Sequence, residues 1–173
     1  SKKYRTFTLN PLPATEETIE TIKKNVAEIR KYIQVPLLLE NVAYYARAEH
    51  AEMDDATFFK RVTEESDCGI LLDVANLFGN ARNIGLNPKD FIDKLPKERI
   101  IQVHLAGGRI YNNLLFDTHD HPVWKETWDL LEYVIKNSDL KAVTIERDDR
   151  YENLEEIMNE VSRARKMLGW RII

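Results

Sequence analysis

The chain has 173 residues, of which 43% are hydrophobic and 31% are charged, an ordinary composition for one globular domain with its own core. The net charge is −4 at pH 7 and no basic block occurs, so the composition gives no support for binding a nucleic acid. No apolar run reaches the roughly 18 residues of a membrane span, and the charged start lacks a signal-peptide core. A single cysteine, Cys68, which we expect to be buried, cannot form an internal disulfide, so we expect a cytoplasmic protein.

The first part of the chain alternates strand-like and helix-like patterns. Residues 4–9 alternate apolar and polar side chains, which predicts a strand. Thr15 is a suitable N-cap for a helix over about 16–33, where isoleucine and valine recur at helical spacing. Residues 35–41 contain a short continuous apolar run, which is typical of a strand buried on both faces. A second helix is predicted over about 55–65.

The middle of the chain continues this alternation. Residues 68–72 predict a second buried strand, and residues 80–85 have the composition of a loop. The dipeptide Asn87-Pro88 predicts a cap and first turn, followed by a short helix. Residues 99–105 predict a third strand, after which two glycines are expected to lead into a loop.

The last part of the chain predicts a helix after Pro122, a fourth strand over residues 141–146 and a final helix over about 152–168. In that final helix the apolar residues, Leu154 among them, are expected to be buried. Strands and helices therefore alternate throughout, which indicates an α/β fold with a parallel sheet. No linker divides the chain, so residues 1–173 are expected to form a single domain.

Each of the four buried strands ends in a side chain that can bind a metal or move a proton. These side chains are Glu40, Asp73, His104 and Glu146. In β/α barrels and in open parallel sheets, functional groups lie at the carboxyl ends of the strands. Asp and Asn also occur there simply as turn residues, so that alternative stays open.

A further cluster lies in residues 115–123, where Asp117, His119 and His121 alternate. In an extended segment these three side chains would point the same way. Carboxylate and imidazole ligands suit iron, manganese or zinc, and the same set serves both non-haem iron oxygen chemistry and two-metal hydrolysis. A polar loop with solvated histidines is the alternative.

The chain length limits the predicted barrel. A closed eight-stranded β/α (TIM) barrel usually needs about 250 residues, and this chain offers too few strands. We therefore expect an open partial barrel, a fragment of a longer protein or one part of an assembled barrel, with parallel strands and outer helices. Exposed strand edges favour self-association or a missing barrel segment as a partner.

Five motifs occur in the order and approximate spacing of one known family. They are Leu38-Leu39-Glu40-Asn41, Leu71-Leu72-Asp73-Val74-Ala75-Asn76, His104-Leu105-Ala106-Gly107, Asp117-Thr118-His119-Asp120-His121-Pro122-Val123 and Ile145-Glu146-Arg147-Asp148. The chain resembles the multinuclear non-haem iron-dependent oxidative enzymes, formerly the DUF692 family, which includes the methanobactin biosynthesis iron enzyme. The resemblance runs from about Pro11 to Gly169 and corresponds to the C-terminal two-thirds of a typical member.

The resemblance implies a xylose-isomerase-like β/α barrel whose first strands are absent from this chain. It implies two or three irons that use dioxygen to modify a ribosomally made peptide, often at cysteine, and a partner protein that presents the peptide. The implied metal-shell residues are Glu40, Asp73, Asn76, His104, Asp117, His119 and Glu146, of which Asp117, His119 and Glu146 would take part in catalysis. The implied orienting or substrate-side residues are Asn41, His121 and Asp148.

The chain departs from the family pattern in several places. Gly108 stands where a histidine is usual, Ala75 where Asn or Asp is frequent, and Arg147 where an aromatic residue is usual. The N-terminal part of the family, with two further histidines, is not in this sequence. Two alternatives to iron chemistry therefore stay open: a divalent-metal sugar isomerase or hydrolase of the same barrel type, using manganese or zinc, and a non-catalytic truncated barrel that acts as a binding or assembly partner.

Overall fold

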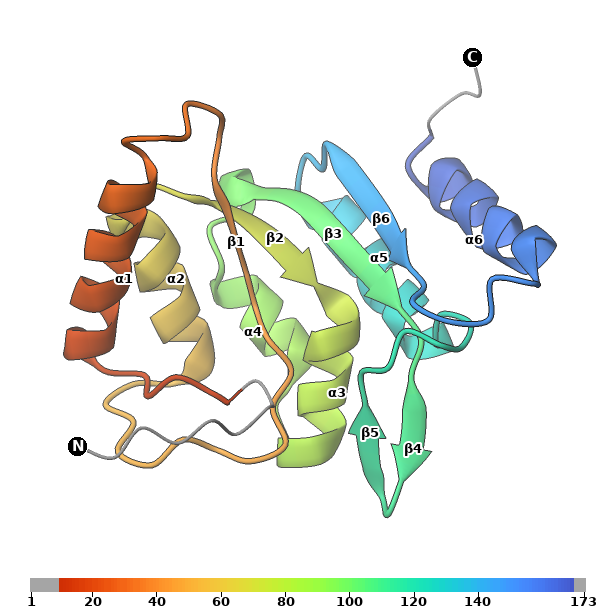
Figure 1. Cartoon of the computed structure of the whole chain (residues 1–173), viewed down its shortest axis with the longest axis horizontal. Helices are drawn as coiled ribbons and strands as arrows, with labels where there is room; N and C mark the ends of the chain where they lie inside the picture. The colour runs from red at the N-terminus through yellow and green to blue at the C-terminus, as the bar shows by residue number, and fades with distance from the viewer. Residues whose placement is uncertain (1–9, 170–173) are drawn as a thin grey trace.

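The computed structural model describes residues 10–169, so the strand predicted over residues 4–9 lies outside the described part of the chain. Within that part, helices and strands alternate as predicted (Figure 1). In chain order the elements are α1 (Glu16–Ile29), β1 (Leu38–Glu40), α2 (Asp55–Glu65), β2 (Gly69–Asp73), α3 (Val74–Ile84), α4 (Pro88–Lys94), the 3₁₀ turn η1 (Lys97–Arg99), β3 (Ile100–Ala106), β4 (Arg109–Tyr111), β5 (Leu114–Phe116), α5 (Lys125–Asn137), β6 (Ala142–Glu146) and α6 (Leu154–Met167).

Among residues 10–169, strands β1, β2, β3 and β6 form one parallel sheet in that order. All three strand pairs are parallel, and helices flank the sheet (Figure 1). This arrangement confirms the predicted α/β class with a parallel sheet. Strands β4 and β5 form a separate antiparallel hairpin that projects beyond the ends of β2 and β3. Closure into a barrel remains a prediction.

Helices α1 to α4 begin where side chains satisfy free backbone N–H groups. The hydroxyl of Thr15 accepts a hydrogen bond from the Thr18 N–H (3.2 Å), as predicted for the start of α1. Asp54 accepts from the Thr57 N–H at the start of α2 (3.0 Å). The cap at Asn87 and the helix that starts at Pro88 are also confirmed. These local signals fix helix starts independently of the tertiary fold.

The core lies between the sheet and the helices. Ile70 and Leu72 of β2 and Val103 and Leu105 of β3 are fully buried, and α3 and α5 pack against β3. Each such side chain stabilises the fold by roughly 1.5–3 kcal/mol relative to exposure. In Figure 1 α4 and α5 lie behind the sheet, and no described helix lies in front of β2, β3 and β6. The intervening strand residues therefore face a side of the sheet that these helices leave uncovered.

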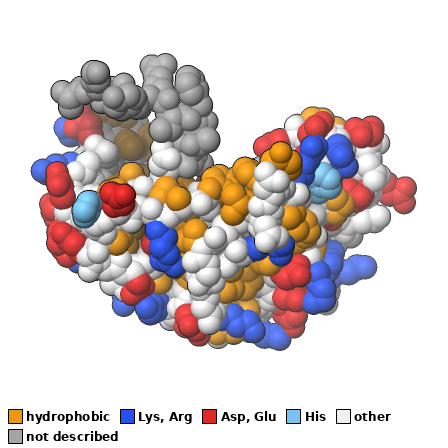
Figure 2. Space-filling view, turned by 90° about the horizontal axis from the view of Figure 1, so that it is seen from below, with side chains coloured by type: hydrophobic (Ala, Val, Ile, Leu, Met, Phe, Trp, Pro, Cys, Tyr) orange, Lys and Arg blue, Asp and Glu red, His pale blue; other side chains and the backbone are white. Residues whose placement is uncertain are grey.

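The space-filling view shows the molecule hollowed on one side, with hydrophobic side chains along the hollow (Figure 2). Such a concave apolar surface is unusual for a complete domain and is typical of a surface that another segment or molecule covers. No helix among the described residues is long and apolar enough to cross a membrane.

Three predicted details of the outer elements are wrong. Helix α1 ends at Ile29 rather than near residue 33. Strand β1 is only partly buried, because within the described residues it pairs on one side alone, with β2. In α6, Leu154 is 63% exposed although its spacing predicted burial. The last two errors concern apolar residues for which the pattern indicates burial but the described chain supplies no cover.

The predicted loop over residues 80–85 is also wrong, because α3 continues to Ile84 and ends at Gly85 in the left-handed conformation. Its asparagines are engaged in tertiary contacts. Asn80 accepts from the Tyr44 N–H (2.7 Å) and donates to the Val42 carbonyl (2.9 Å). These bonds to a neighbouring segment explain why residues typical of loops lie within a helix.

The hairpin β4–β5 was not predicted. Its turn is formed by Asn112 and Asn113, which both have positive φ (46° and 67°), as the commonest two-residue hairpin turn requires. The Asn-Asn pair between Tyr111 and Leu114 was the sequence signal for it. One edge of the hairpin is paired by a side chain, because Asn83 donates to the Leu115 carbonyl (2.9 Å) and accepts from the Leu115 N–H (2.8 Å).

Candidate metal centre

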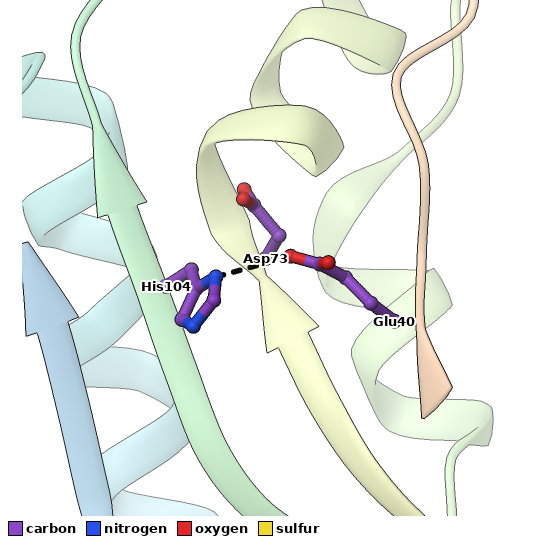
Figure 3. A group of neighbouring side chains, drawn as sticks. All are labelled: Glu40, Asp73 and His104. Atoms are coloured by element: carbon purple, nitrogen blue, oxygen red, sulfur yellow. Dashed lines mark ion pairs between the residues drawn. The ribbon is translucent and has the colours of Figure 1, made fainter. Parts of the chain in front are cut away.

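The parallel register brings three strand ends together. Asp73 at the end of β2 pairs with His104 of β3, and Glu40 is the last residue of the neighbouring β1. One ligand atom from each of Glu40, Asp73 and His104 lies within 4.8 Å of the others. Figure 3 shows the three side chains converging from their separate strands. The structure thus places three of the four predicted strand-end groups in one cluster.

His104 is the centre of this cluster. Its Nδ1 lies 3.1 Å from a carboxylate oxygen of Glu40 and 3.1 Å from one of Glu146. This nitrogen is buried, and among the described residues it has no partner in hydrogen-bond geometry. Burial lowers the pKa of His104, but the two carboxylates outweigh this and raise it to about 10.

The carboxylates respond to the same surroundings. Burial, with the charges of nearby carboxylates, raises the pKa of Asp73 to about 8, although the Asn76 N–H acts against it. The ring of His104 lowers the pKa of Glu146. Several acidic groups therefore crowd a partly buried site around His104, and such a site favours a protonated ring or a bound cation.

The loop after β5 adds a second histidine. His119 Nε2 lies 2.9 Å from Asp117 and 3.8 Å from Glu146, and its Nδ1 lies 3.1 Å from Asp148. Nε2 is also buried without a hydrogen-bond partner in the described chain. The neighbouring Asp117 carboxylate raises the pKa of His119 to about 9. Glu146 thus lies between the two histidines.

The predicted extended course of this loop is wrong. His119 has φ of +50°, an uncommon conformation for a residue other than glycine, and such strain is frequent at functional sites. His121 does not share the direction of Asp117 and His119. Its Nδ1 lies 2.5 Å from the buried carboxylate of Asp120, which also pairs with Arg109 of β4. His121 therefore contacts Asp120 within the loop and does not join Asp117 and His119.

Two asparagines hold Asp73 in place. The Asn41 side chain donates to the Asp73 carbonyl (2.8 Å) and accepts from the Asp73 N–H (2.9 Å). One Asp73 carboxylate oxygen accepts from the Asn76 N–H (2.7 Å), and the Asn76 side chain donates to the Asn41 carbonyl (3.1 Å). The Asn76 Oδ1 is buried without a partner among the described residues, so it is available as a ligand.

The structure shows the surroundings of two residues that depart from the family pattern. At Gly108 a Cβ would overlap the carbonyl of Phe116, so the local backbone leaves no room for a histidine. The side chain of Arg147 is 4% exposed and pairs with Glu156 (3.0 Å) and Glu160 (3.2 Å) of α6. Arg147 therefore connects β6 to α6 through these ion pairs.

Sequence reasoning missed Gln102, whose side-chain amide lies 3.0 Å from His104 Nε2. The available signal was its position two residues before His104 in an otherwise apolar strand, since alternate strand residues share a face. It also missed Arg109 and Asp120, for which the sequence offered no signal because their contact depends on the hairpin.

The residues present fit a divalent metal. Two imidazoles and several carboxylates converge, and the buried nitrogens of His104 and His119 face carboxylates without forming hydrogen bonds to them. Nitrogen and oxygen ligands of this kind suit iron, manganese or zinc. The arrangement is thus a candidate carboxylate and histidine metal centre.

The chain is similar to known proteins over most of its length. A UPF0276 protein of Caulobacter vibrioides is 34% identical over 170 residues, which covers 97% of this chain and 61% of the relative. A UPF0276 protein of Acaryochloris marina is 31% identical over 156 residues, or 90% of this chain and 56% of the relative. One of Neisseria meningitidis serogroup B is 35% identical over 160 residues, or 91% and 57%.

The chain therefore spans 56% to 61% of the length of these relatives. Residues 1–169 match the family described as RiPP precursor modification enzyme MbnB/TglH/ChrH. That range contains every strand-end group of the candidate metal centre. The chain belongs to this family of RiPP precursor modification enzymes.

Proposed function

We propose that this chain is the C-terminal part of a β/α barrel enzyme that uses non-haem iron and dioxygen to modify a ribosomally made peptide, with a cysteine-containing peptide as the expected substrate. The observation that carries the proposal is the convergence of His104 and His119 on Glu146, at 3.1 Å and 3.8 Å, from separate strand ends and a loop. Mixed histidine and carboxylate ligation is typical of non-haem iron sites.

The proposed ligands fall into two groups that meet at Glu146. Glu40, Asp73 and His104 lie on one side, and Asp117 and His119 lie on the other. Asn76 would add its buried carbonyl oxygen to the first group. When bound, iron would supply the activation of dioxygen. Manganese and zinc fit the same ligand types, so metal identity is part of the proposal.

The chain's own residues would prepare the site. Asp73 is fixed by Asn41 and by the Asn76 N–H, which leaves its second carboxylate oxygen free to bind. Asp148 lies 3.1 Å from His119 Nδ1 and is 73% exposed, so it can orient the ring and take up its proton at the solvent side. Burial of the two histidines limits access of water to the ligand nitrogens.

A cavity of about 250 Å³ adjoins Glu40 between β1 and α2 and would suit part of a peptide. Its lining includes Leu12, Ile22, Phe58 and Val62, with Asn41 beside Glu40 at the polar end. Apolar walls with a few polar groups at one end are typical of sites that bind small apolar groups. A cysteine or aliphatic side chain has the right character to enter it. A partner protein that presents the peptide also belongs to this proposal.

Anaerobic loading with ferrous iron tests the metal part of the proposal. The chain should retain iron after desalting, and His104→Ala and His119→Ala should each lower the iron content measured by elemental analysis. His50→Ala, which changes a histidine whose side chain is 91% exposed, is the matched control. Iron content near zero in the wild-type chain and in a full-length relative would contradict it.

Dioxygen consumption with a candidate precursor peptide tests the oxidative part. Uptake that depends on iron and is abolished by Asp117→Ala would support it. Turnover with manganese or zinc under strict anaerobiosis would instead favour an isomerase or hydrolase. Tight peptide binding with no turnover under either condition would favour a non-catalytic binding role.

A further inference from the structure

The face of the sheet that carries the candidate centre also carries two further polar side chains next to His104. Gln102 lies two residues before His104 in β3, so the two side chains lie on the same face. Thr144 of β6 is paired in register with His104. The side-chain nitrogen of Gln102 lies 3.0 Å from His104 Nε2 and donates to the Thr144 hydroxyl at 3.0 Å. One atom of the Gln102 amide therefore contacts both His104 and Thr144.

The two nitrogens of the His104 ring face different surroundings. Nδ1 faces the carboxylates of Glu40 and Glu146 at 3.1 Å, and Nε2 faces Gln102. A cation held by these carboxylates would bind His104 through Nδ1. A neutral imidazole carries one proton, so that proton must then lie on Nε2 and needs an acceptor.

Gln102 can supply this acceptor. Rotation of the terminal amide of Gln102 by a half-turn exchanges its nitrogen and its oxygen. The oxygen then lies within hydrogen-bond distance of His104 Nε2 and the Thr144 hydroxyl. The ring N–H of His104 and the hydroxyl of Thr144 would then both donate to the same carbonyl oxygen. Histidines that bind metals almost always donate their second ring N–H in this manner, which fixes the tautomer and the ring orientation.

We propose that Gln102, supported by Thr144, is a positioning residue that accepts the Nε2 proton of His104 and so presents Nδ1 to the metal. This inference rests on the metal centre of the proposed function, but it concerns a residue outside the ligand set. It predicts which nitrogen binds: Nδ1 in His104, against the carboxylate side of the site.

The protonation of His104 can be read without any metal. In the metal-free chain at neutral pH both ring nitrogens of His104 should carry protons, and long-range ¹H–¹⁵N spectra should show that the Nε2 N–H exchanges slowly with water, because Gln102 accepts it. In Gln102→Leu, which removes the acceptor, this exchange should become on the order of 10-fold faster or more. Fast exchange of the Nε2 proton in the wild-type chain, or equal exchange in Gln102→Leu, would overturn the proposal.

Metal affinity gives the second readout, with Co²⁺ as the probe and its ligand-field absorption as the signal. Gln102→Leu should weaken Co²⁺ binding by ~10–100-fold, and Thr144→Val should weaken it less. Gln102→Glu keeps an acceptor and should restore binding. Gln34→Leu, the same change at an exposed glutamine, is the control and should bind as the wild type does.

The two readouts separate this inference from the proposed function. If the wild-type chain and a full-length relative bind no Co²⁺, the proposed metal centre is wrong, and the ring spectra still decide whether Gln102 holds the Nε2 proton. If Co²⁺ binds equally well to the wild type and to a folded Gln102→Leu variant, the metal centre stands and the role of Gln102 is overturned. Circular dichroism and thermal unfolding establish that each variant is folded.

Discussion

Glu146 lies near both histidines of the candidate centre, which makes it a sensitive position at the scale of single residues. Its two carboxylate oxygens lie 3.1 Å from His104 Nδ1 and 3.8 Å from His119 Nε2. A nearby negative charge stabilises the protonated ring and so raises its pKa. We therefore expect Glu146→Gln, in the presence of a chelator, to lower the pKa of both histidines, by roughly one pH unit or more for His104.

Histidine titration by NMR measures this effect. Asp148→Asn is the matched control, because Asp148 lies 3.1 Å from His119 Nδ1 and is 73% exposed. It should lower the pKa of His119 modestly and leave that of His104 unchanged. A shift of only one histidine in Glu146→Gln would show that Glu146 does not join the two groups of ligands.

Asp120 illustrates a residue that supports the site without lying in it. Burial acts to raise its pKa, but hydrogen bonds from Thr118, His121 and Arg109 outweigh this and hold the pKa of Asp120 well below its usual range. Because the folded-state pKa is depressed, the carboxylate stabilises the fold fully above its unfolded pKa of about 3.9, and the contribution is lost as pH falls below that value.

We expect Asp120→Asn to lower the free energy of unfolding at pH 7 by ~2 kcal/mol, because a hydrogen-bonded buried charge is lost. The difference from the wild type should shrink as the pH is lowered below about 4. Urea unfolding across this range measures it. Asp139→Asn, at a side chain that is 88% exposed, should change little at any pH. A pH-independent loss in Asp120→Asn would contradict the role given to its charge.

At the scale of secondary structure, the loops beside the centre depend on close backbone contacts. A Cβ at Gly107 would overlap the carbonyls of His121 and Pro122, and one at Gly108 would overlap that of Phe116. These contacts hold the loop with Asp117 and His119 against the end of β3. Restoring the family's usual residue with Gly108→His should therefore fail to add a ligand and should destabilise the chain by ~1–3 kcal/mol or more.

Gly79→Ala is the control for this prediction. Gly79 lies within α3, and a Cβ there would meet a Leu115 side-chain atom at an ordinary 3.6 Å. This change should be neutral or stabilise by up to about 1 kcal/mol, because alanine favours the helix. Thermal unfolding of both variants, together with the metal content of Gly108→His, tests this prediction. A stable Gly108→His variant with increased metal content would contradict it.

Local sequence signals predicted some of these elements and missed others. Periodicity and caps predicted the parallel strands and the starts of α1 and α4, because these depend on local chemistry. Strand ends predicted the grouping of Glu40, Asp73 and His104, because parallel strands carry their carboxyl ends to one edge. Asn83 was wrongly predicted to lie in a loop, because its side chain forms two hydrogen bonds to the backbone of Leu115, 32 residues away, and local sequence does not show such contacts.

At the scale of the whole molecule, the sheet of the described residues has two unpaired edges. Within residues 10–169, β1 and β6 each pair with one neighbour only, and the surface is hollowed on one side (Figure 2). Tyr111 and Leu154 are more than 60% exposed, at 67% and 63%. Unpaired strand edges and exposed apolar side chains favour association with another segment.

We expect the chain to bind the part of a relative that lies outside the matched region. That part of the Caulobacter vibrioides relative, the segment beyond the matched 61%, can be added as a separate polypeptide. If it completes the barrel, the mixture should form a 1:1 complex by light scattering, unfold at a higher temperature and bind more iron per chain, since new strands would add ligands at the same edge. A segment of the same composition in scrambled order should do none of these. A chain that stays monomeric at high concentration and ignores the added segment would show that the described sheet needs no further strands.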